Sequence, residues 1–119
     1  MPLKGILLAL GIALFMFGGS AQAQSHSVSL MWTASVDTGA SYNIYRLSGV
    51  CPVSGTAGFT KISATPVSGT TFSDAALSAG AYCYYVTAVL SGAESLPSNL
   101  AAAVILPGAP TSLLVTGTN

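Results

Sequence analysis

Apolar and polar residues alternate along much of this chain with the two-residue period of a β-strand. One segment has its apolar residues at every second position, at Val28, Leu30 and Trp32. A second segment repeats this spacing at Tyr42, Ile44 and Arg46. Alternation of this kind predicts strands that bury one face and expose the other.

The segment 82–89 carries the strongest strand signal in the chain. One face of it presents Tyr82, Tyr84 and Val86, and the other face presents bulky residues such as Tyr85. Two well-filled faces predict a central strand. From these segments we expect the following core residues: Trp32, Tyr42, Ile44, Tyr82, Tyr84 and Val86.

Shorter segments complete an all-β pattern. Three of them predict short strands, at 59–62, 70–73 and 100–106. Loops rich in glycine, serine and proline separate the strands at 48–58 and 91–99, and Asp74 begins a predicted turn. Strands at this spacing, without an amphipathic helix between them, predict a β-sandwich of about six strands.

The first residues predict a signal peptide. An apolar stretch, 5–17, follows Lys4 and is too short to span a bilayer comfortably. Small residues end this region at Ala23, as a signal peptidase requires. We therefore expect residues 1–23 to be removed and residues 24–119 to be secreted, either extracellular or periplasmic, without a membrane segment. The alternative is an uncleaved anchor.

The secreted part that this cleavage predicts is poor in charge. Its charged side chains are two basic and three acidic ones: Arg46, Lys61, Asp37, Asp74 and Glu94. So few cations provide no electrostatic surface for nucleic acid or anionic lipid, which excludes both classes of partner.

Several short motifs have the order and spacing of a known module. They are Val28-x-Leu30-x-Trp32, Tyr42-Asn43-Ile44-Tyr45-Arg46, Phe59-Thr60-Lys61-Ile62, Gly69-Thr70-Thr71-Phe72-Ser73-Asp74, Leu77-x-x-Gly80-x-Tyr82 and Glu94-Ser95-x-Pro97-Ser98-Asn99. Together they resemble a fibronectin type III domain of bacterial secreted proteins. The resemblance covers about 27–106 and implies an immunoglobulin-like sandwich over 24–106.

The resemblance also implies a special tyrosine and a missing strand. Tyr82 is expected to be the corner tyrosine of the family, with its ring in the core and its hydroxyl bonded to backbone near Leu77. Family members begin with a strand A, but here the secreted chain would begin almost on strand B. The tail 107–119 resembles the lead and strand A of a following module. The tail is then part of a tandem array, disordered, or paired with the strand B edge of its own or another molecule.

Two cysteines in an exported chain predict a disulfide. In the family that this chain resembles, the strands carrying 42–46 and 82–89 are antiparallel neighbours, so Cys51 and Cys83 would lie at the same end of the sandwich. The alternatives are two buried free thiols or a redox pair. A redox pair is disfavoured because the chain has no Cys-x-x-Cys spacing.

The remaining ionisable residues give little support for an enzyme. His26 is expected to be a solvated residue near the new N-terminus. Asp37 and Glu94 belong to loops that meet at one end of this fold, so a weak calcium site or a hydrolase with paired carboxylates is an alternative to two solvated acids. We expect no catalytic residue, no cofactor and no metal.

The function expected from these observations is a non-catalytic secreted or cell-surface module that binds or spaces. Its partner would be an extracellular protein or a polysaccharide, contacted through these residues: Asp37, Tyr45, Tyr85 and Glu94. An alternative is a structural subunit that self-associates through the strand B edge and the C-terminal tail. A small secreted hydrolase is the least favoured alternative.

Overall fold

The computed structural model describes residues 25–119, and every regular element in this part of the chain is a β-strand. The predicted signal peptide lies outside the described residues. The strands are β1 (His26–Met31), β2 (Ser41–Ser48), β3 (Thr60–Lys61), β4 (Thr71–Leu77), β5 (Gly80–Leu90), β6 (Ala93–Glu94) and β7 (Ala101–Ile105).

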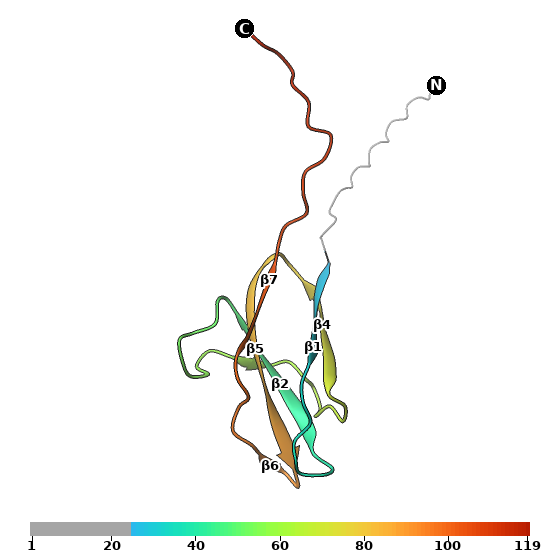
Figure 1. Ribbon diagram of the computed structural model, residues 1–119, viewed down its shortest axis with the longest axis vertical. Helices are drawn as coiled ribbons and strands as arrows, with labels where there is room; N and C mark the ends of the chain where they lie inside the picture. The colour runs from blue at the N-terminus through green and yellow to red at the C-terminus, as the bar shows by residue number, and fades with distance from the viewer. Residues whose placement is uncertain (1–24) are drawn as a thin grey trace, which may run out of the picture.

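These strands form two packed antiparallel sheets (Figure 1). The smaller sheet contains β1 and β4, and the larger one contains β3, β2, β5, β6 and β7. Strand β5 pairs with three neighbours, β2, β6 and β7. The all-β sandwich predicted from the sequence is confirmed, and its strongest predicted strand is the central one.

The register between β2 and β5 divides the side chains of the larger sheet into two sets. On the inner face Ile44 lies opposite Val86, and on the outer face Tyr45 lies opposite Tyr85. Ile44 is completely buried, whereas both tyrosines on the outer face are only half-buried. The two-residue period of the sequence therefore corresponds to an inner and an outer face of this sheet.

The hydrophobic core lies between the two sheets. Its buried members are Ile44, Leu77, Tyr82 and Tyr84, and Tyr42 is buried beside Trp32 with the two ring centroids 5.4 Å apart. Trp32 and Val86 are half-buried and pack against this cluster. The six residues expected in the core thus differ in burial, with four buried and two half-buried.

Tyr82 has the geometry that the resemblance implies for the corner tyrosine. Its side chain is 7% exposed, and its hydroxyl donates a hydrogen bond of 2.8 Å to the backbone carbonyl of Ser78, the residue after Leu77. This bond joins the short β4–β5 connection to the core.

The turn predicted at Asp74 is wrong, because β4 continues through this residue to Leu77. The pairing of β1 with β4 shifts register between His26 and Val28, so that one residue of β1 faces two residues of β4. Within this bulge Ala76 has a φ of 60°, a left-handed conformation that alanine seldom adopts. Asp74 points into the core by the regular alternation of β4, and the bulge after it brings Leu77 to the same face.

Two further expectations are corrected by the strand pairing. His26 is not a solvated terminal residue, because it lies in β1, pairs with Leu77 of β4 and is half-buried. The predicted loop 91–99 contains the short strand β6. Serines of this loop beyond β6 also form hydrogen bonds with β5. The hydroxyl oxygens of Ser95 and Ser98 accept hydrogen bonds from backbone amides of β5, where a neighbouring strand would supply carbonyls.

The structure contains the predicted disulfide between Cys51 and Cys83. Cys83 lies on the outer face of β5, and its side chain is nevertheless completely buried. The β2–β3 loop that carries Cys51 comes close to the sheet, since a Cβ added to Gly58 would lie 3.3 Å from Leu47 Cδ1. The disulfide therefore holds this loop over the outer face of the larger sheet.

Candidate functional site

One end of the sandwich, which we call the loop pole, brings together the β1–β2 and β5–β6 connections (Figure 1). A hollow of about 260 Å³ lies there, and Asp37 and Glu94 both line it, as the topology of the resembled family implied. Three aliphatic side chains of neighbouring segments are exposed: Val36 in the β1–β2 connection, Leu90 at the end of β5 and Leu96 after β6 are 97%, 40% and 87% exposed. The loop pole thus combines two carboxylates with exposed apolar groups.

Glu94 is not simply a solvated loop acid. Its Oε2 accepts hydrogen bonds from the Tyr45 hydroxyl at 2.5 Å, from the Thr87 hydroxyl at 2.5 Å and from the Asn43 amide at 3.3 Å. These donors, the Thr87 hydroxyl first, hold the pKa of Glu94 below its ordinary value of 4.5. The same contact raises the pKa of Tyr45, because the carboxylate favours the protonated phenol.

The two candidate tyrosines of the outer face stack on each other. Their ring centroids are 4.5 Å apart with an interplanar angle of 7°, and Phe59 from the β2–β3 loop packs edge-on against Tyr85 at 4.9 Å. Each ring therefore has one face covered by its partner. In this arrangement the aromatic rings cover one another on the sheet beside the β2–β3 loop.

The structure therefore divides the four candidate residues into two groups that share Glu94. Asp37 meets Glu94 at the hollow of the loop pole, and Tyr45 with Tyr85 lies beside Glu94 on the outer face. Glu94 belongs to both because β6 places it at the edge of β5, opposite Val89.

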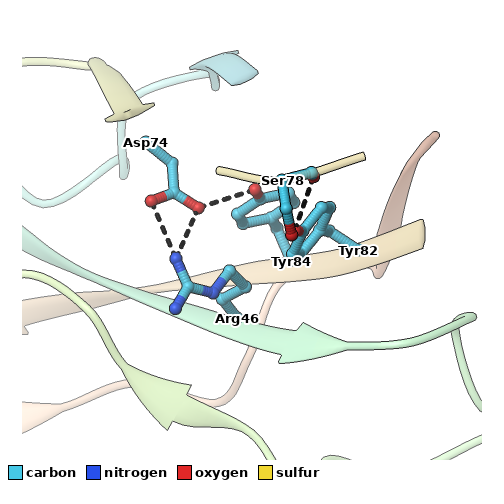
Figure 2. A network of polar contacts seen from close by, with 5 residues as sticks. All are labelled: Arg46, Asp74, Ser78, Tyr82 and Tyr84. Carbon is cyan, nitrogen blue, oxygen red and sulfur yellow. Dashed lines mark hydrogen bonds and ion pairs between the residues drawn. The ribbon is translucent and has the colours of Figure 1, made fainter. Parts of the chain in front are cut away.

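Sequence reasoning missed a polar network between the two sheets (Figure 2). The guanidinium of Arg46 on β2 contacts both carboxylate oxygens of Asp74 on β4, at 2.9 and 3.0 Å. The hydroxyl of Tyr84 donates a third bond of 2.7 Å to the same carboxylate. Burial, together with this bond, raises the pKa of Tyr84 strongly. The side chain of Asp74 is only 8% exposed, so the network ties the sheets together inside the molecule.

One signal in the sequence pointed to this network. Arg46 continues the inward series of Tyr42 and Ile44, and a cation on a buried face requires an anionic partner. That partner, Asp74, was assigned to a turn, whereas it lies in β4 on the inward face.

Comparisons with known proteins add no relative. Neither protein-family models nor curated proteins match this chain. Over residues 25–119 the structure has no helix of the length and apolarity needed to cross a membrane. The same residues contain no group of three or more histidine, cysteine, aspartate and glutamate side chains placed to hold a metal ion.

The lowered pKa of Glu94 predicts an acid-dependent contribution to stability. A carboxylate whose folded pKa is depressed stabilises the fold above its ordinary pKa, near 4.5, and this stabilisation is lost as the pH falls through the folded pKa. We expect wild type to exceed E94Q in free energy of unfolding at pH 7, and this difference to shrink below pH 4. Urea unfolding of both proteins at each pH measures the difference, and an unchanged gap would contradict the prediction.

Proposed function

We propose that this chain is an exported, non-catalytic module of the fibronectin type III kind, which binds an extracellular protein through its loop pole. Three features support the family assignment: two antiparallel sheets in a sandwich, a tyrosine that bonds the β4–β5 connection and the order of the sequence motifs. A disulfide supports an oxidising compartment outside the cytoplasm.

The observation that carries the binding role is the exposure of aliphatic side chains beside the hollow. Val36 and Leu96 are almost fully exposed, and their chain neighbours Asp37 and Ser95 line the hollow. Exposed apolar side chains next to polar ones are typical of surfaces that bind proteins. Loops on a rigid scaffold are also the usual position of binding residues.

The same geometry makes the outer face a weaker binding surface for sugars. A sugar ring stacks on an open aromatic face, whereas Tyr45 and Tyr85 cover each other. The phenol of Tyr45 is also bonded to Glu94. A protein partner at the loop pole is therefore favoured over a polysaccharide partner on the sheet.

The test measures how much cell-surface protein of the producing cells is captured by chemical cross-linking, and compares wild type with two variants. The double variant V36S/L96S should reduce capture by about tenfold or more, because two aliphatic side chains lose their apolar contact with the partner. The matched control is V53S, since Val53 is 106% exposed on the β2–β3 loop, away from the loop pole.

Two results would refute the proposal. Equal loss of capture in the control would show that the surface is not specific. The other result is wild-type protein that binds a glycan array and loses this binding when Tyr85 is replaced by alanine. It would indicate that the binding surface is the outer face and that the partner is a polysaccharide.

A further inference from the structure

Within the described residues, strand β1 is paired along one edge only. It pairs with β4 on one side, and no other strand among residues 25–119 pairs with it. Its exposed edge therefore offers a row of backbone donors and acceptors to an incoming strand. We call this edge of β1 the open edge.

The core is incompletely covered beneath the open edge. A hollow of about 390 Å³ lies between β1 and the larger sheet, and its lining includes Leu30, Trp32 and Val86. The inward residues of β1 are only half-buried, although they pack against the core cluster. An added strand with apolar side chains on its inward face would cover them.

The same chain presents a segment with the chemistry needed for this position. The C-terminal tail (107–119) forms no strand and extends away from the end of β7 (Figure 1). Its three consecutive apolar residues Leu113, Leu114 and Val115 are 94%, 75% and 82% exposed. Neither the tail nor β1 carries an acidic or a lysine or arginine side chain, so no charge opposes their contact.

The direction of the strands disfavours pairing within one molecule. Strand β7 is antiparallel to β5, and it ends at the same end of the sandwich at which β1 begins (Figure 1). A tail that turned back over the sandwich would therefore run parallel to β1. Antiparallel pairing, which has the better hydrogen-bond geometry, requires the tail of another molecule.

We propose that residues 111–116 of one molecule add as an antiparallel strand to the open edge of β1 in a second copy. This segment has six residues, as has β1. Pro107 and Pro110 precede it and keep the connection from extending β7, because proline lacks the backbone donor that a ladder requires. The donor segment and the acceptor edge are different surfaces, so the association is head-to-tail and can continue from molecule to molecule.

The alternation of a strand gives this proposal a specific signature. Leu113 and Val115 project to one face of the added strand, and Leu114 projects to the other. The inward pair would enter the hollow above the core, and Leu114 would face solvent. An aspartate at an inward position would be buried without a partner, but an aspartate at 114 would stay solvated.

The first experiment uses light scattering of the exported protein over a range of concentrations. Wild type should associate in a concentration-dependent way, and L113D and V115D should each weaken association by about tenfold or more. The matched control L114D should change it by less than about threefold, since its side chain remains in water. Because every residue of the tail is exposed, these variants should fold like wild type.

The second experiment locates the acceptor edge. One protein carries S29C, on the exposed side of β1, and a second carries one cysteine in the tail, at 112, 114 or 116 in turn. Mixing the two under mild oxidation should yield a disulfide-linked dimer for at least one tail position. The control replaces S29C by T60C, at an exposed position of β3, and should yield none. The native cysteines are already paired with each other.

Three outcomes would overturn the proposal. They are a wild-type protein that stays monomeric at every concentration, an L114D variant as defective as L113D, and equal cross-linking of the tail to β3. The second outcome would indicate non-specific apolar contact rather than strand addition. None of these outcomes bears on the loop pole, so the proposed binding function can fail or succeed independently.

Discussion

Replacing Asp74 with alanine should lower the free energy of unfolding by about 3 kcal/mol. The change leaves the guanidinium of Arg46 and the hydroxyl of Tyr84 without the carboxylate that accepts their hydrogen bonds. An uncompensated charge inside a protein costs more than the intact pair contributes. Part of the Arg46 side chain, 29%, is exposed, so water relieves some of the cost and the lower end of the expected range applies. Urea unfolding at pH 7 measures the change.

A matched double variant separates the lost partner from the lost packing. R46M/D74L replaces the pair with apolar side chains and should recover most of the stability, because neither charge then remains buried alone. Y84F, which removes only one donor, should cost about 1 kcal/mol. A D74A protein as stable as wild type would mean that the network does not hold the sheets together.

Removal of the disulfide should have an effect of similar size. The bond closes a loop with a sequence separation of 32, and the chain-entropy relation then gives about 3.7 kcal/mol. We expect the double variant C51A/C83A to lose about this much stability in urea, and alanine to fit at position 83, where the native side chain is completely buried. Reduction of the wild type should give a similar loss.

The C51A/C83A variant also serves as the control for effects of the reductant other than reduction of this disulfide. Its unfolding should be unaffected by dithiothreitol, whereas the wild-type transition should move to lower urea. A wild type whose transition is indifferent to reductant would show that the β2–β3 loop is held over the sheet by packing alone.

The period of the sequence predicted the larger sheet well, because β2 and β5 are long and alternate without interruption. Tyr42 with Ile44, and Tyr82 with Tyr84, were assigned to inward faces and are buried there. Trp32 was placed within a strand, and it lies one residue beyond β1, where its amide still bonds the carbonyl of Thr70.

The pattern failed at β4, because composition and tertiary structure disagree there. Asp74 is followed by small residues, and such a sequence is typical of a turn. The strand nevertheless continues through Asp74, whose carboxylate lies on the inward face with Phe72 and binds a cation from the other sheet. A contact between residues 28 positions apart is not visible in local periodicity.

The candidate site was predicted in part for the same reason. The topology of the resembled family was enough to bring Asp37 and Glu94 to one end of the sandwich. The bonds of Glu94 to Thr87 and Tyr45 depend on the register of the two-residue strand β6, which lies within a predicted loop. Very short strands carry no period from which a register can be deduced.

The unequal size of the two sheets has a consequence for how the molecule opens. A sheet of two strands has little independent stability in water, whereas β5 is anchored by three neighbours and by the disulfide. The sandwich thus contains one self-supporting layer and one that depends on it. Local unfolding should begin with β1 and β4, and the Arg46–Asp74 pair is the bond that such an opening must break first.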